Sequence, residues 1–393
     1  LMQPHREVYG FLAGAQLNLY VAGLTIIAWL ASKERKVAPI TPLPILLFAF
    51  GAWCCVTTYL AIDTDTAAPL LERTLKSLLL AFFVVTIVGT RFRIQAVIWA
   101  IVISLGFYAI KGGGFVLLTG GTHRVYGPED TMIGDNNVLG LALVMLLPLL
   151  NYLRVTTERR DLRMALLAVI GLTFIAVLGT QSRGALVALA AGLAVYVARS
   201  KSGLIVVAVA AVSIMALPQV LPKNWVERFA SIETADQDTS FLQRVQAWRT
   251  STNIALARPT GGGFSAVESN EVAQTYASAD SLKAGKAAHS IYFQVLGDHG
   301  FIGLAIFLMI LGASLFNSAM ALAKSRDRPD LWWARQLAVM MQVSIISYIV
   351  GGAALSMAYY DGVLIILALT AALYQVVRKP LQEGAPDANI PNW

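Results

Sequence analysis

The sequence predicts an all-α fold, a polytopic membrane helix bundle of about eleven visible transmembrane helices with one large periplasmic loop. Of the 393 residues, 57% are hydrophobic and only 13% are charged, whereas a soluble domain carries about 25% charged residues. The apolar residues come in continuous blocks near the roughly twenty residues that span a bilayer. Because the strands of a membrane barrel alternate apolar and polar residues, continuous blocks favour helices.

The expected spans follow one another along most of the chain. They cover residues 8–31, 43–62, 70–89, 94–110, 133–153, 164–179, 185–198, 204–217, 301–323, 337–352 and 355–377. Basic loops alternate with acidic, mixed or uncharged ones, and they lie at residues 33–36, 91–93, 154–163, 199–201, 324–335 and 378–379. Since basic loops stay in the cytoplasm, the C-terminus is expected inside and residues 1–7 outside. A start on the outer side predicts a further helix before Leu1, giving about twelve in the full protein.

This alternation divides the chain into four parts. Residues 1–217 hold the N-terminal transmembrane helices, and residues 218–300 form the periplasmic loop with an amphipathic helix and candidate site residues. Residues 301–378 hold the C-terminal transmembrane helices, and residues 379–393 form a polar cytoplasmic tail.

Neither a metal nor a nucleotide site is indicated by the sequence, and no cofactor is expected. Cys54 and Cys55 are adjacent within an apolar block, so we interpret them as small lipid-phase side chains rather than a disulfide. The glycine run 261–263 lacks the lysine and serine of a P-loop. The net charge of +7 needs no nucleic-acid partner, because membrane proteins place their cations in particular loops.

The first outer segment, residues 111–137, is rich in glycine, which permits tight turns and close backbone approach. Asp135, Asn136 and Asn137 stand where a helix is expected to begin, so one of them is a candidate N-cap. Capping and turn formation are one interpretation of this segment, and contact with a ligand is the other.

Arg183 lies in the tight turn G-T-Q-S-R-G at the outer rim of the membrane. An arginine deeper in lipid costs ~2.5–3.5 kcal/mol on insertion scales, and such residues are usually functional. At the rim, Arg183 either extends to lipid phosphates or binds a substrate phosphate, and the sequence leaves both open.

The long outer segment contains a predicted helix that begins at a capping box, Ser240 with Gln243, and ends near Ala257. An apolar stripe at helical spacing is formed by Phe241, Val245 and Trp248. Arg244 projects from beside this stripe, so a helix lying on the membrane directs it at the headgroup layer. Its planar fork suits phosphate, although contact with lipid headgroups alone is an equal alternative.

Two histidines follow in A-H-S-I-Y-F-Q-V-L-G-D-H-G. His289 stands at the membrane surface, and a neutral imidazole accepts a proton near pH 7, so it is a candidate general base. A structural role is the alternative for His289. His299, in an expected turn just before a span, is interpreted as structural.

In combination and order, the motifs resemble the O-antigen ligase superfamily, especially the branch known as exosortase-associated O-glycosylation ligases. The resembling stretches are Y-A-I-K-G-G-G-F, L-L-T-G-G-T-H-R-V-Y-G-P-E, I-G-D-N-N, S-R-G-A-L-V-A-L, R-V-Q-A-W, R-P-T-G-G-G-F and A-H-S-I-Y-F-Q-V-L-G-D-H-G-F-I-G. They run through residues 106–303, and the helical pattern extends the likeness to almost the whole chain.

The resemblance implies a glycosyltransferase that moves a glycan from undecaprenyl pyrophosphate to the lipid A–core oligosaccharide. It implies a multi-pass protein of the bacterial inner membrane whose active site faces the periplasm, working without metal and with inversion of the anomeric centre. The family's loop histidine corresponds to His289, as general base for the acceptor hydroxyl. The family's essential arginines correspond to Arg183 and Arg244, which are implied to bind the pyrophosphate.

Further substrate-binding candidates are Arg124, Arg249, Asp361 and Asn136, of which Asp361 is implied to orient the base or the acceptor.

The loop at residues 278–287 departs from the family pattern, because it carries Lys283 and Lys286 against a single acid, Asp280. The family pattern is more acidic there, so acceptor recognition is open. A basic lip suits a phosphorylated core oligosaccharide.

Three alternatives remain. An O-antigen polymerase uses the same donor class with a second lipid-linked glycan as acceptor, and a protein O-glycosylation ligase uses a protein acceptor. A lipid-linked glycan flippase, from a different functional class, places essential charges within spans, whereas the spans expected here are nearly free of charge.

Overall fold

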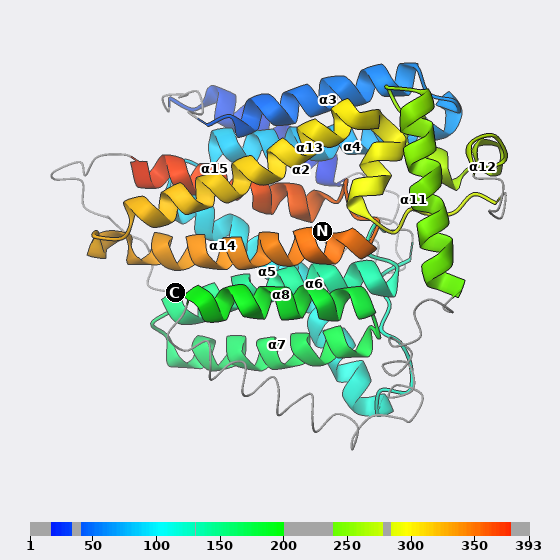
Figure 1. Ribbon diagram of the computed structural model, residues 1–393. Helices are drawn as coiled ribbons and strands as arrows, with labels where there is room; N and C mark the ends of the chain where they lie inside the picture. Colours follow the sequence, from blue (N-terminus) through cyan, green and yellow to red (C-terminus); the bar gives the residue numbers. More distant parts are fainter. Residues whose placement is uncertain (1–16, 34–40, 130, 200–238, 278–283, 379–393) are drawn as a thin grey trace.

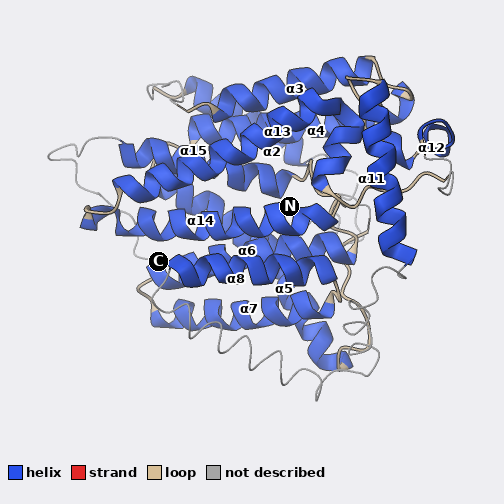
Figure 2. Cartoon of the chain, viewed as in Figure 1, coloured by secondary structure: helices blue, strands red, loops and turns tan. Residues whose placement is uncertain are grey.

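The computed structural model describes residues 17–33, 41–129, 131–199, 239–277 and 284–378. Within these ranges the chain forms helices joined by loops, without strands (Figure 2). The expected span at residues 204–217, the expected tail at 379–393 and the acidic and basic residues Asp280 and Lys283 lie outside the described residues.

The helices follow the chain in two groups. The first group contains α2 (Leu17–Ala31), α3 (Leu43–Tyr59), α4 (Thr64–Ile87), α5 (Arg91–Thr119), α6 (Asn136–Thr156), α7 (Arg160–Gly179) and α8 (Arg183–Arg199). The second contains α11 (Thr239–Ala257), η2 (Ala266–Glu268), α12 (Asn270–Tyr276), α13 (Ile291–Lys324), η3 (Pro329–Leu331), α14 (Trp332–Gly351), η4 (Gly352–Ala354) and α15 (Asp361–Arg378).

Six of the described helices are long and apolar enough to cross a membrane, namely α5, α6, α7, α13, α14 with its flanking turns, and α15. Two shorter apolar helices are α2 and α3. The chain is therefore a helical, multi-pass membrane protein, as predicted, while the number of about eleven spans stays a prediction.

Most of the helices run side by side, and α11 crosses their ends instead of running along them (Figure 1). Helix α6 is buried along most of its length and packs against α7, α8 and α14. Helix α13 packs against α3, α11, α14 and α15. The starts of α6, α8, α13 and α15 are consequently gathered at the end of the bundle that α11 covers.

Helix α5 is longer than the sequence suggested, because residues 111–119 are helical and do not form the expected loop. The reason is close packing on α7: a Cβ added at Gly113 would stand 2.4 Å from the backbone oxygen of Leu172. The expected close backbone approach is thus confirmed at Gly113, whereas the expected tight turns are not formed in this stretch.

Helix α13 is also longer than the expected span and has a kink at Gly300 (φ 67°, ψ −169°). A Cβ at Gly300 would stand 2.0 Å from the backbone oxygen of Pro259. The amide of Gly262 donates to the carbonyl of Gly297 over 2.8 Å. The glycine run 261–263 is therefore a packing surface for α13, in agreement with its lack of a P-loop pattern.

Two further expectations concern the ends of helix α11 and the state of the two cysteines. Helix α11 ends at Ala257, as predicted, and its described part already includes Thr239, one residue before the predicted capping box. Both cysteines are free, with Cys54 buried and Cys55 exposed, which confirms that they form no disulfide with each other.

We predict that Gly300→Ala destabilises the protein. The φ/ψ of Gly300 belongs to a region that costs other residues about 1–3 kcal/mol, and the added methyl meets the Pro259 carbonyl. We expect the melting temperature of the detergent-solubilised protein to fall by about 2 °C or more. The control is Gly312→Ala in the same helix, where a Cβ meets nothing within 4 Å. An unchanged melting temperature for Gly300→Ala would contradict the packing described here.

Candidate active site

The starts of α6 and α8 meet at the covered end of the bundle. The side-chain amide of Asn136 donates to the carbonyl of Thr180 over 2.7 Å, in the turn that leads into Arg183. A Cβ at Gly140 would stand 2.8 Å from the Cβ of Ala185. Asp135 is the N-cap of α6, as the sequence allowed, and accepts from the amides of the following turn. Asn136 is buried by this arrangement, and its substrate-binding role stays a prediction.

The start of α13 reaches the same place through η4. A Cβ at Gly352 would stand 2.6 Å from Ile291, and a Cβ at Gly184 would stand 3.5 Å from Leu355. The hydroxyl of Tyr292 donates to the carbonyl of Ile349 over 2.8 Å. The turn holding Arg183 and the turn holding His289 are thus both fixed to the short connection between α14 and α15.

Helix α11 is fastened to the chain beside His289 by Trp248. The indole nitrogen of Trp248 donates to the carbonyl of Ala288 over 2.7 Å. Its ring stacks on Phe293, with centroids 5.0 Å apart and an angle of 8° between the planes. Arg244 lies one helical turn before Trp248, so the same contact brings Arg244 to the side of His289.

Charged groups from two other parts of the chain act on the pKa of His289. Burial lowers the pKa of the His289 imidazole below its usual range, the positive charge of Arg244 lowers that pKa further, and the carboxylate of Asp135 acts in the opposite direction. The neutral imidazole is therefore favoured, and this is the form that accepts a proton.

The backbone of His289 is held in an uncommon conformation. Its φ is +44°, a region that non-glycine residues seldom adopt. Gln181, in the turn before Arg183, also has a positive φ of 53°. Such conformations persist where the surroundings determine them, and they are frequent at functional sites. The Trp248 bond to Ala288 on one side and the start of α13 on the other supply that constraint.

The three remaining candidate residues differ in their burial and in their position relative to the Arg183 turn. Arg124 is half-buried and next to Val125, whose amide donates to the carbonyl of Gly179 over 2.9 Å, so it lies beside the Arg183 turn. Asp361 is half-buried at the start of α15. Arg249 is exposed on α11, one position after Trp248.

One polar cluster in this region had no functional prediction from the sequence. Asp298 and His299 are 2% and 0% exposed at the kink of α13. Asp298 accepts from the hydroxyl of Tyr359 over 2.8 Å, and the Nδ1 of His299 lies 2.7 Å from Oγ1 of Thr57. His299 was expected in a turn but is helical. In the sequence, only the two adjacent polar residues before Gly300 could have indicated this cluster.

Within the described ranges, no group of three or more His, Cys, Asp or Glu side chains is placed to hold a metal ion.

Two segments of the chain match known protein families. Residues 167–308 match a family described as O-Antigen ligase. This match supports membership of the O-antigen ligase superfamily. The matched segment includes Arg183, Arg244 and His289. Residues 1–158 match a family of unknown function, DUF5935. A comparison with curated proteins finds no match.

We predict that Arg244→Gln raises the pKa of His289, because the positive charge that lowers it is removed. The control is Arg249→Gln, an exposed position on the same helix, which should leave the pKa unchanged. Asp135→Asn should shift it in the opposite direction, downward. Hydrogen–deuterium exchange at the imidazole C2 carbon, followed by mass spectrometry, measures each value. Equal shifts in Arg244→Gln and Arg249→Gln would contradict the arrangement.

Proposed function

We propose that this protein is an O-antigen ligase. It transfers a glycan from undecaprenyl pyrophosphate to the lipid A–core oligosaccharide at the periplasmic face of the bacterial inner membrane. The observation that supports this most is the placement of Arg244 beside a largely neutral His289, fixed by Trp248. A cation and a proton acceptor at one end of a membrane bundle suit a phosphate-bearing lipid donor and a hydroxyl acceptor.

Binding of the donor is assigned to two arginines. The donor enters from the outer leaflet, and Arg183 and Arg244 hold its pyrophosphate. Charge-assisted hydrogen bonds of this kind contribute roughly 1.5–3 kcal/mol each. Arg124, beside the Arg183 turn, is a further contact for the donor. Asn136 keeps that turn in place through the Thr180 carbonyl.

Transfer itself is a single displacement. The acceptor oxygen forms a bond to the anomeric carbon while His289 takes the hydroxyl proton. The bond from that carbon to the pyrophosphate oxygen breaks, and undecaprenyl pyrophosphate departs with the electron pair. Attack opposite the leaving group inverts the anomeric centre. The arginines neutralise the charge that develops on the leaving group. Asp361 and Arg249 are assigned to the acceptor.

The same site chemistry serves an O-antigen polymerase or a protein O-glycosylation ligase, which differ only in the acceptor. A flippase for the lipid-linked glycan requires no general base. Acceptor analysis therefore separates the first two from the ligase, and turnover separates the flippase.

We predict that His289→Ala abolishes ligation in a deletion strain complemented with the variant. Loss of a general base typically costs ~10²–10⁴-fold in rate. Lipopolysaccharide separated on a gel should lack O-antigen on its core, while lipid-linked polymer accumulates. The matched control is His123→Ala, an exposed histidine to which the proposal assigns no role, which should restore the wild-type profile.

Two other outcomes of this experiment would contradict the proposal. A core that carries a single repeat unit indicates a polymerase. An unchanged lipopolysaccharide profile with His289→Ala shows that the acceptor or the general-base role is wrong.

The pH dependence of transfer gives a second prediction. Because the pKa of His289 is lowered from about 6.5, the purified enzyme should keep a constant kcat/KM through pH 7 and lose activity only below about pH 6.5, as the imidazole becomes protonated. Activity is lost toward low pH because the neutral imidazole is the form that accepts the proton. An acid limb that begins above pH 7, or one that persists in residual activity of His289→Ala, would assign the base to another group.

A further inference from the structure

The start of α13 carries a buried hydroxyl that the rest of the described chain does not satisfy. Ser290 is the N-cap residue of α13 and has the extended backbone of a helix cap (φ −158°, ψ 126°), yet its side chain makes no cap hydrogen bond. The residue is 1% exposed, and its Oγ has no hydrogen-bond partner within the described ranges. A buried hydroxyl without a partner costs free energy, so this one requires an explanation.

The backbone amides of the same helical turn are also unpaired. The amide of Gln294 donates to the carbonyl of Ser290 over 2.8 Å, and this is the first bond of the helix. The amides of Ile291, Tyr292 and Phe293 precede that bond and have no acceptor among the residues that the structure describes. Three N–H groups and one hydroxyl therefore lie at one helix end, where the helix dipole favours negative charge.

Two other helix starts at this end of the bundle are capped by their own chain. Asp135 accepts from the first-turn amides of α6, and Oγ of Ser182 accepts from the amide of Ala185 at the start of α8 over 3.2 Å. Serine is among the preferred N-cap residues, so its residue type does not explain why the Ser290 hydroxyl caps nothing. The donors at the start of α13 are thus available to an acceptor from outside the described chain.

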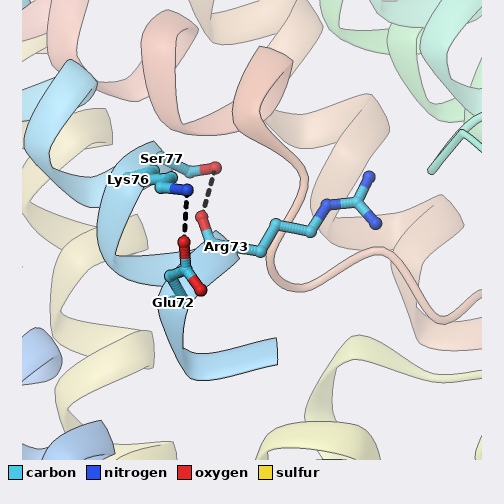
Figure 3. Close-up of polar contacts among 4 residues, drawn as sticks. All are labelled: Glu72, Arg73, Lys76 and Ser77. Carbon is cyan, nitrogen blue, oxygen red and sulfur yellow. Dashed lines mark hydrogen bonds and ion pairs between the residues drawn. The ribbon is translucent and has the colours of Figure 1, made fainter. Parts of the chain in front are cut away.

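Exposed charges on α4, by contrast, are satisfied within their own helix. Glu72 and Lys76 form an ion pair one turn apart, and the hydroxyl of Ser77 donates to the carbonyl of Arg73 (Figure 3). These residues lie inside the expected span at residues 70–89, so the expectation that the spans are nearly free of charge is wrong for this stretch. The Glu72–Lys76 pair needs no ligand, whereas the buried groups at the start of α13 have no such partner.

The charges around Ser290 indicate that the missing acceptor is an anion. Ser290 directly follows His289, and the positive charge of Arg244 is close enough to lower the pKa of that imidazole. The carboxylate of Asp135 also acts on His289, but its Oδ1 already accepts from the first turn of α6. An anion with several acceptor oxygens can therefore pair with Arg244 and with the start of α13 together.

We propose that the start of α13 binds a phosphate of the donor pyrophosphate, with the Ser290 hydroxyl and the amides of residues 291–293 as hydrogen-bond donors. This inference rests on the proposed function, because it adds a further contact for the same donor. Helix N-termini bind phosphate through backbone N–H groups in this way. Ser290 is thereby a substrate-binding residue next to the general base.

The test measures binding of undecaprenyl pyrophosphate, without a glycan or an acceptor, to the purified full chain. Titration in detergent, followed by native mass spectrometry, gives the dissociation constant. Ser290→Ala should weaken binding about tenfold or more, because a hydrogen bond to a charged group is lost. Ser290→Gly, which also lacks the hydroxyl and is tolerated at an N-cap, should show the same loss. The phosphate-free lipid undecaprenol should bind the wild type and both variants equally.

Thermal stability separates ligand binding from helix capping. Because the Ser290 hydroxyl makes no cap bond, Ser290→Ala should keep or raise the melting temperature. Ser182→Ala removes the bond to the Ala185 amide and should lower the melting temperature. A lower melting temperature of Ser290→Ala with unchanged lipid binding would show that Ser290 serves the helix alone, and this would overturn the proposal.

The matched control for binding is Ser314→Ala in the same helix. Ser314 is buried, and its hydroxyl donates to the carbonyl of Ile310 over 2.8 Å, so this variant should bind the lipid as the wild type does. Unchanged binding in a folded Ser290→Ala protein, or a wild type that does not bind undecaprenyl pyrophosphate, overturns the proposal.

Two further arms identify the source of the phosphate and separate the proposal from the transfer reaction. A phosphorylated core oligosaccharide is titrated in parallel, and a loss of binding for this ligand alone in Ser290→Ala assigns the phosphate to the acceptor and overturns the proposal. Glycan transfer is assayed on the same preparations. Weaker lipid binding in Ser290→Ala, in a protein whose wild type transfers no glycan, supports the phosphate site and contradicts the ligase. Transfer by a Ser290→Ala protein that binds the lipid normally supports the ligase and contradicts the phosphate site.

Discussion

The kink in α13 is the constraint on which the covered end of the bundle depends. At this kink the hydroxyl of Tyr359 donates to Asp298 over 2.8 Å, and the indole of Trp53 donates to the carbonyl of His299 over 2.8 Å. Phe264 packs its ring edge-on against His299, with centroids 4.5 Å apart. Buried polar groups are costly unless they are paired, so these bonds fix a single arrangement. Gly300 then allows the backbone to turn at this point.

The kink in α13 also determines the position of His289, which directly precedes the first turns of this helix. The kink holds residues 291–299, which end in the buried Asp298 and His299, against α3 and against the residues before α15. His289 precedes that segment directly, and Trp248 fixes the residue before His289 to α11. The imidazole is thus positioned from both sides, which is why an uncommon φ is maintained there. Positioning of this kind is what general-base catalysis requires.

Composition alone was sufficient to predict the helical membrane class, but not the ends of the helices. Helix α5 continues through Gly113 because the α7 backbone lies against it, and α13 starts ten residues before the expected span because Asp298 and His299 are covered by other helices. Both helix ends are set by tertiary packing, so they cannot be predicted from the length of an apolar stretch in the sequence. The site shows the same limit. The motifs matched Arg244 to an essential family arginine and left Arg249 as a lesser candidate, but they did not contain the Trp248 contact that brings Arg244 to His289 while Arg249 stays exposed.

The coupling between Arg244 and His289 has a consequence under the proposed function. In the free protein, the charge of Arg244 lowers the pKa of His289 and so weakens it as a base. A pyrophosphate held by Arg244 brings negative charge to the same place and offsets that effect. The basicity of His289 therefore rises when the donor is bound, when an acceptor proton has to be removed. Without the donor, the imidazole stays neutral and weakly basic, so the cation that binds one substrate also adjusts the base that activates the other.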